Sequence, residues 1–218
     1  MDLGLKLENI LYNKLHFVNM VKFTANEIRD IIISMFAISI AFAYIFSGRD
    51  LSTVMSFLPL TIVAVGLAFL LHELAHKFVA IRFGYWAEYK MWNQGLILAL
   101  IASYFGWVFA ALGAVYIHGY HIKNAENGII SLAGPATNII LALLFLMAIP
   151  LASQYGLVSL AIIGAILNSF IAVFNLIPFA IFDGAKIFRW NPIIWVATMG
   201  LAVFIWLHSV GFNISSLL

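Results

Sequence analysis

The chain has 218 residues, of which 64% are hydrophobic and 9% are charged, with a formal net charge of +2 and no cysteine. Soluble domains are about 45–50% apolar and about 25% charged, so the composition excludes an ordinary soluble domain and predicts a polytopic protein of the lipid bilayer. The small net charge gives no basis for a nucleic-acid partner, and the lack of cysteine excludes disulfide and thiolate chemistry.

The N-terminal stretch, residues 1–30, mixes apolar and charged side chains. Its partly amphipathic pattern predicts an interfacial arm, with a solvated tail as the alternative. It carries charges of both signs and does not resemble a cleavable signal peptide. We expect residues 31–218 to form a single membrane-embedded domain, with its core between residues 51 and 190.

Five apolar stretches are long enough to be transmembrane helices. They are residues 31–48, 51–84, 129–150, 156–177 and 193–210. The second stretch is longer than a span requires, which predicts a tilt or a projection beyond the bilayer. Pro59 marks either an early kink in it or the true start of its helix.

The region between the second and third spans has a different pattern. Residues 85–92 alternate in character, which predicts a strand at the membrane interface. Residues 95–122 are apolar but interrupted by glycine, and they form either a full span or a re-entrant element. His118 and His121 lie in a strand-like part of this region, where positions three apart face opposite sides. We therefore interpret them as interfacial residues rather than a second metal pair.

The distribution of basic residues decides between the two topologies. If residues 95–122 do not cross the bilayer, ten of the eleven basic residues lie on one side and only Arg49 lies opposite. If they cross, the split becomes seven to four. Since cytoplasmic loops carry the excess of Lys and Arg, we expect an all-α polytopic protein of the cell membrane, with a cytoplasmic N-terminus. Five transmembrane helices and a re-entrant or β-hairpin membrane element after the second helix make up this fold.

The second span contains His72-Glu73-Leu74-Ala75-His76, directly after an uninterrupted run of apolar residues and glycine. Ionisable groups within a membrane helix are costly and indicate function. Residues four apart share one face of a helix, so His72 and His76 can bind one metal ion together. Two imidazoles at this spacing suit Zn²⁺, and Glu73 is the candidate general base for the attacking water.

A catalytic zinc site needs a third protein ligand. The five-helix topology returns Asp183 to the side and depth of the two histidines, and no other aspartate occurs after position 50. A carboxylate with apolar neighbours needs a partner, which zinc would provide; capping of a short helix is the alternative role. Asn175, just before Pro178, is a candidate contact for a substrate backbone or an oxyanion, or it satisfies carbonyls freed near the proline.

These residues carry a family resemblance. The His72–His76 motif followed by Asn175-x-x-Pro178-x-x-x-x-Asp183-Gly184 resembles the paired motifs of the site-2 protease family of intramembrane zinc metalloproteases. Ala133-Gly134-Pro135-x-x-Asn138 is similar to a further family segment. The resemblance covers residues 60–190, and no stretch resembles the PDZ or CBS domains of some relatives.

The resemblance implies one zinc ion per chain and a site made of three ligands and a base: His72, His76, Asp183 and Glu73. It implies that Asn175 contacts the substrate near the scissile bond, makes Asn138 a second candidate for substrate binding, and implies a membrane-embedded β element after the motif helix. Ala180 and Ala185 stand where the family often has proline and glycine, and they leave the ligands in place.

The sequence thus predicts a zinc metalloendopeptidase that cleaves a transmembrane protein substrate in or near its membrane segment, in regulated intramembrane proteolysis. One alternative is an integral-membrane zinc protease acting on soluble or lipidated C-termini, in which a downstream glutamate usually supplies the third ligand. Glu88 and Glu126 are the glutamates after the motif. Another alternative is a metal transporter or other non-proteolytic metal-binding membrane protein. The sequence does not determine the oligomeric state.

Overall fold

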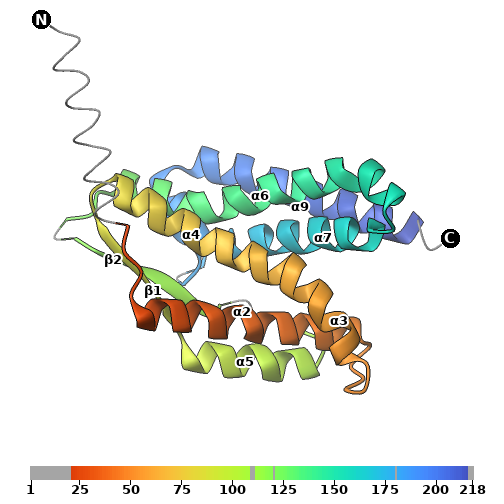
Figure 1. The fold of residues 1–218 in the computed structure, drawn as a ribbon. Coiled ribbons are helices and arrows are strands. Elements are labelled where there is room, and N and C mark those ends of the chain that lie inside the picture. Colours follow the sequence, from red (N-terminus) through yellow and green to blue (C-terminus); the bar gives the residue numbers. More distant parts are fainter. Residues whose placement is uncertain (1–20, 109–110, 120, 180, 216–218) are drawn as a thin grey trace, which may run out of the picture.

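The computed structural model describes residues 21–108, 111–119, 121–179 and 181–215 (Figure 1). Helices make up most of it, with a two-stranded sheet at one end of the bundle beside α2 and α4. The elements in chain order are α2 (Ala25–Phe46), α3 (Val54–Thr61), the π-helical turn η1 (Ile62–Gly66), α4 (Leu67–Arg82), β1 (Trp86–Met91), α5 (Asn93–Tyr104), β2 (Gly113–His118), α6 (Asn124–Gln154), α7 (Val158–Asn175), α8 (Asp183–Trp190) and α9 (Pro192–Ser215).

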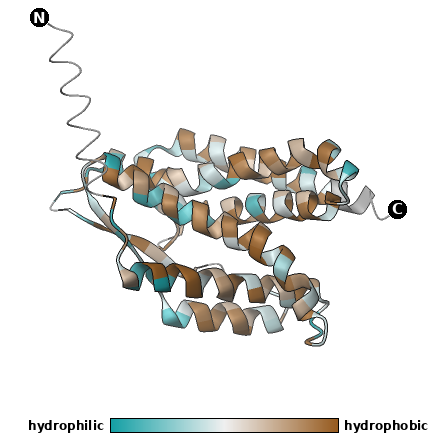
Figure 2. Cartoon of the chain, in the orientation of Figure 1, coloured by the Kyte–Doolittle hydropathy of each residue, from teal (hydrophilic) through white to brown (hydrophobic). Residues whose placement is uncertain are grey.

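Five of these helical segments are long and apolar enough to cross a membrane, which confirms the predicted all-α polytopic fold. Apolar side chains dominate them, and hydrophilic residues are concentrated toward the helix ends (Figure 2). The second span is one continuous helix, Val54–Arg82, built from α3, η1 and α4. Pro59 lies inside α3 rather than at its start, and the π-helical turn follows α3 directly.

Two helices begin earlier than the apolar pattern predicts, because polar capping residues belong to their first turns. The first span starts at Ala25 rather than at residue 31, and the Thr24 hydroxyl accepts a hydrogen bond from the Glu27 amide. The third span starts at Asn124 rather than at residue 129, where the Glu126 carboxylate accepts from the Lys123 amide. The predicted arm, residues 1–30, therefore overlaps the first helix, and residues 1–20 lie outside the described part of the chain.

The segment after the motif helix, made of β1, α5 and β2, turns back on itself. Strands β1 and β2 pair antiparallel, from Trp86 opposite His118 to Met91 opposite Gly113. The intervening α5 has 12 residues and is about 18 Å long, well short of a hydrocarbon core of about 30 Å. This region is therefore re-entrant, as the charge distribution predicts, and it combines a short helix with a hairpin. His118 and His121 are exposed there.

Two large apolar clusters hold the helices together, and a smaller third cluster joins α4, β1 and α6. One joins α2, α4, α5 and α7, with Ile38, Phe69 and Ile171 among its buried members. The other joins α6, α7, α8 and α9 around residues such as Leu176 and Ile187. Since α7 contributes to both large clusters, it connects the half of the bundle that carries the hairpin to the half that carries α8.

Helix α2 closes one edge of the hairpin. The Glu27 carboxylate pairs with Lys77 on α4, and both side chains are almost fully buried. Glu27 also accepts a hydrogen bond from the Tyr89 amide (3.1 Å), and Asp30 accepts one from the Met91 amide (3.2 Å). These amides belong to alternate residues of β1 and so point to one edge of the strand, away from β2. The open edge of the hairpin is therefore that of β2.

Candidate active site

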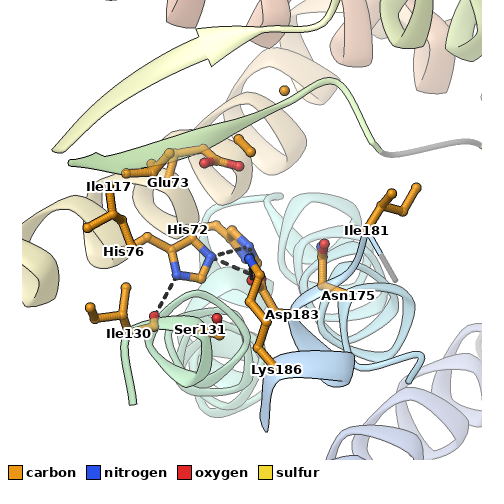
Figure 3. Close-up of a pocket in the computed structure, with 13 residues that line it drawn as sticks. His72, Glu73, His76, Ile117, Ile130, Ser131, Asn175, Ile181, Asp183 and Lys186 are labelled. Atoms are coloured by element: carbon orange, nitrogen blue, oxygen red, sulfur yellow. Dashed lines mark hydrogen bonds and ion pairs between the residues drawn. The ribbon is translucent and has the colours of Figure 1, made fainter. Parts of the chain in front are cut away.

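The two histidines and the aspartate predicted as ligands come together beside β2 (Figure 3). His72 and His76 lie one turn apart on α4, with their Nε2 atoms 3.0 Å apart. Asp183 Oδ2 lies 3.5 Å from His72 Nε2 and 3.0 Å from His76 Nε2. Both histidines are buried, and Asp183 is 9% exposed. Within the described residues, a group that could hold a metal ion thus joins α4 to a helix more than a hundred positions later.

Asp183 reaches the histidines because α8 begins against the end of α7. A Cβ atom at Gly184 would lie 2.0 Å from the carbonyl oxygen of Leu176, so glycine permits a backbone approach that a side chain would block. The indole of Trp195 on α9 donates to the same carbonyl (2.8 Å). The aspartate–glycine pair therefore supplies a ligand and the close packing that positions it.

Helix α6 leaves space beside the ligand atoms at Gly134. A Cβ atom at this position would lie 2.4 Å from His76 Nε2 and 2.5 Å from His72 Nε2. Glycine inside a helix is less stable than alanine by about 0.5–1 kcal/mol. The absence of a Cβ atom leaves space for a group bound to both nitrogens.

The donor set fits a zinc ion. Zinc binds imidazole nitrogen at about 2.0–2.1 Å, which places tetrahedral ligand atoms roughly 3.4 Å apart. The three ligand atoms here are separated by 3.0–3.5 Å. Two imidazoles and one carboxylate leave a fourth position for water or substrate, which is typical of catalytic rather than structural zinc.

Each histidine is oriented through its other ring nitrogen. His76 Nδ1 lies 2.7 Å from the carbonyl oxygen of Ile130 on α6. Because a carbonyl oxygen can only accept, Nδ1 is the donor of this contact and Nε2 is left to the metal. His72 Nδ1 contacts the side-chain oxygen of Asn138. The Asn138 amide donates to the Ala68 carbonyl (3.2 Å) and to Asn168 Oδ1 (3.1 Å). These contacts assign the oxygen of Asn138 to the histidine.

This geometry bears on the expectation for Asn138. Its side chain is fully buried behind His72, on the far side of the ring from Asp183, and it is absent from the walls of the cavity described below. In the structure Asn138 contacts a candidate metal ligand, and its contact with a substrate stays a prediction. Asn175, in contrast, lines the cavity, and its amide donates to the Ile171 carbonyl one turn back (3.0 Å).

Glu73 lies on the β2 side of the site (Figure 3). It follows His72 by about 100° around the helix and is 8% exposed. Its Oε2 atom has no hydrogen-bond partner within the described part of the chain. A carboxylate oxygen that faces a cavity beside a metal centre can accept a proton from water. The geometry therefore fits the base that the motif predicts.

A cavity of about 50 Å³ adjoins the ligands and Glu73. Its walls include the outward positions of β2, Gly113, Val115 and Ile117, and Asn175 faces it from α7. Lys186 also lines it, with Nζ 3.5 Å from Asp183 Oδ1. Asp183 thus directs one oxygen to the histidines and the other to a cation. The open strand edge and the metal centre share one space.

Comparison with known proteins assigns the chain to a family. A protein of Methanocaldococcus jannaschii named "Putative zinc metalloprotease MJ0611" is 41% identical over 186 residues, which cover 84% of this chain and 94% of that protein. The chain belongs to this zinc metalloprotease family. "Putative zinc metalloprotease YwhC" of Bacillus subtilis is 29% identical over 154 residues, 61% of this chain and 69% of that protein. No family model and no solved structure matches the chain.

Membership of the zinc metalloprotease family implies zinc and agrees with the donor set, and the His72–His76–Asp183 group could bind this metal. The sequence patterns did not point to Asn168 or Lys186 as parts of this metalloprotease site. Asn168 is a polar residue within an apolar span, a signal that indicates function in a membrane helix. Lys186 stands three positions after Asp183, on the same face of a helix. Both signals were present, but the neighbours of each residue depend on long-range packing.

Proposed function

We propose that this zinc metalloprotease is an intramembrane protease of the site-2 type, which hydrolyses a peptide bond in or beside a transmembrane segment of another membrane protein. The observation that carries the proposal is the position of the metal centre. Two ligands and the base lie on a helix long and apolar enough to span a membrane, Val54–Arg82, and the re-entrant hairpin lies against them.

The chemistry follows from the three kinds of groups in the site. His72, His76 and Asp183 would hold the zinc ion, which would lower the pKa of a bound water and polarise the scissile carbonyl. Glu73 takes the proton from the attacking water and transfers it to the leaving amine. Asn138 and the Ile130 carbonyl keep the two imidazoles in the tautomer that directs Nε2 to the centre.

The hairpin supplies a way to hold the substrate. A helical segment engages its carbonyls in its own backbone hydrogen bonds, so it must unwind before hydrolysis. An unwound segment can add to the free edge of β2, whose outward residues line the metal cavity. The outer edge of β1 is not open to a substrate strand, because its Tyr89 and Met91 amides already donate to Glu27 and Asp30. Asn175 faces the added strand from the opposite wall and contacts its backbone.

The basic residues support a membrane orientation. With 95–122 re-entrant, the positive-inside rule directs the N-terminus and the open side of the site toward the cytoplasm. We propose the cell membrane as the location and a single metalloprotease domain over residues 31–218.

The contacts of the two downstream glutamates favour this proposal over a protease of soluble or lipidated C-termini. Glu88 accepts a hydrogen bond from Thr24 (2.6 Å), and Glu126 accepts from Tyr85. Asp183 is the carboxylate beside both histidines. Zinc content after Asp183→Ala and after Glu126→Ala separates the two hypotheses. We expect loss of zinc only in the first variant.

The test of function uses the purified protein in proteoliposomes with synthetic transmembrane peptides. We expect the wild type to release fragments cut within or beside the membrane segment, and Glu73→Gln to release none while it keeps one zinc ion per chain. Glu88→Gln is the matched control and retains activity. Full activity of Glu73→Gln would contradict the proposal, and so would transport of zinc without cleavage.

A further inference from the structure

A second cavity, of about 40 Å³, lies on the other side of the catalytic groups. It shares five wall residues with the metal cavity: His72, Glu73, Gly113, Asn175 and Ile181. The walls that it does not share differ in chemistry from those of the metal cavity. They are Ile38 of α2, Phe69 of α4, Ala111, Ile171 of α7 and Phe182, all of them apolar. The unshared walls of the metal cavity combine the polar residues His76, Ser131, Asp183 and Lys186 with the apolar residues Ala114, Val115, Ile117 and Ile130. The second cavity, called the apolar compartment for its unshared walls, meets the metal cavity at the base Glu73.

The apolar walls belong to the packed interior. Ile38, Phe69 and Ile171 are each at most 5% exposed and are members of one hydrophobic cluster. Phe69 packs edge-on against Tyr89, with ring centroids 5.6 Å apart. Phe182 packs in the same way against Phe174 at 4.9 Å. Close-packed interiors have low compressibility. The packing of these walls therefore fixes the size of the compartment.

We propose that the apolar compartment is a substrate subsite for one small aliphatic side chain, belonging to a residue that flanks the scissile bond. The proposal rests on the function proposed above. The occupant follows from location, chemistry and size. A substrate strand along β2 passes Gly113, where the two cavities meet. Side chains of a strand project to either side of its backbone, so a residue beside the reacting carbonyl is within reach of this compartment.

Size and polarity restrict the occupant. A cavity needs about 10–15 Å³ to hold one water-sized group, so about 40 Å³ accommodates roughly three such groups. The single carbon of an alanine side chain fits within this limit, the three carbons of valine fill it, and leucine and the rings of phenylalanine and tryptophan exceed it. A charged or amide side chain would lose its hydration against Ile38, Phe69 and Ile171. The polar groups on the shared walls, His72, Glu73 and Asn175, are those that the proposed function assigns to zinc, to the attacking water and to the substrate backbone. The subsite therefore selects by size and by apolar character.

The test measures cleavage of synthetic transmembrane peptides by the purified zinc-loaded protein in detergent. Mass spectrometry first locates the cut that the wild type makes. The two residues flanking that cut are then replaced, one at a time, by Ala, Val, Leu, Phe or Trp. At one of the two positions we expect kcat/KM for Phe and Trp to be at least about tenfold below that for Val, because excess size in a fitted pocket costs about that factor.

The matched variants alter the compartment from α7. Ile171→Ala enlarges it and is expected to raise the Phe-to-Val ratio of kcat/KM by about tenfold, and Ile171→Val, which perturbs folding less, gives a smaller rise. Ile162→Ala removes the same atoms from a buried position of α7 outside the compartment and leaves the ratio unchanged. A wild type that accepts Phe and Val equally at both positions, or an unchanged ratio in both Ile171 variants, would overturn the subsite. Absence of any cleavage by the wild type would instead refute the proposed function, and the subsite with it.

Discussion

The contact between Asn138 and His72 makes a quantitative prediction about zinc. Asn138→Ala removes the oxygen that holds His72 Nδ1 and leaves Asn168 Oδ1 without the donor it has now. The imidazole then loses the anchor that fixes its tautomer and direction. We expect the metal centre to weaken although no ligand is changed.

The expected magnitude follows from the hydrogen bonds that the substitution removes. Removal of a hydrogen-bond partner of a metal ligand lowers metal affinity by about 10–100-fold, which corresponds to about 1.4–2.8 kcal/mol. Loss of a partner at a fully buried group costs about 1–3 kcal/mol, so the two estimates agree. Asn138 is 0% exposed, and water does not replace the missing oxygen readily.

Zinc affinity is measured by titration of the purified protein against a competing chelator, with thermal unfolding of the metal-free protein recorded beside it. Ser169→Ala is the control, because Ser169 is equally buried and its hydroxyl bonds only to carbonyls of its own helix, those of Ala165 and Ile166. We expect Ser169→Ala to keep wild-type affinity. A dissociation constant of Asn138→Ala within twofold of the wild type would refute the orienting role.

Three further substitutions test other contacts. Gly134→Ala should lose zinc without loss of helix content, because the added Cβ would meet both ligand nitrogens. Gly200→Ala, which has no atom within 4 Å of the added Cβ, should keep zinc. Metal analysis and circular dichroism compare the two variants. Glu27→Gln leaves Lys77 buried without its charge partner and should destabilise the fold by about 3–5 kcal/mol. In denaturant unfolding, the double variant with Lys77→Met should recover much of this loss. Equal stability of the single variant and the wild type would argue against the buried pair. Lys186→Met removes a partly exposed cation beside Asp183 and should change zinc affinity by less than about fivefold, since such ion pairs contribute about 0.2–1 kcal/mol. The chelator titration measures this change, and complete loss of zinc would give Lys186 a larger role than this.

The local part of the site was predictable from sequence because its signals are local. His72 and His76 are four positions apart on a helix, and Glu73 lies between them. Asp183 required one more step, the count of basic residues that makes 95–122 re-entrant and returns the chain to the same side. The structure brings this carboxylate within 3.5 Å of both histidines.

The remaining features depend on packing between distant segments. The residue type of Asn138 does not show whether its side chain faces a substrate or His72. Only the crossing of α6 over α4 decides between these positions. The hairpin pairs positions 22 to 32 apart in the sequence, so alternation predicts the strands but not which edge stays open. The closed edge is the one that Glu27 and Asp30 cover. Both residues lie at the start of α2, which the sequence predicts to begin only at residue 31.

The central claim is that Glu73 drives peptide hydrolysis within the membrane. It is tested most directly by comparing membrane proteomes of cells that carry the wild-type protein with those of cells that carry Glu73→Gln at equal abundance. We predict fragments whose new termini map within or beside transmembrane segments in the wild-type cells and not in the variant cells. Identical fragment sets in the two kinds of cell would contradict the claim.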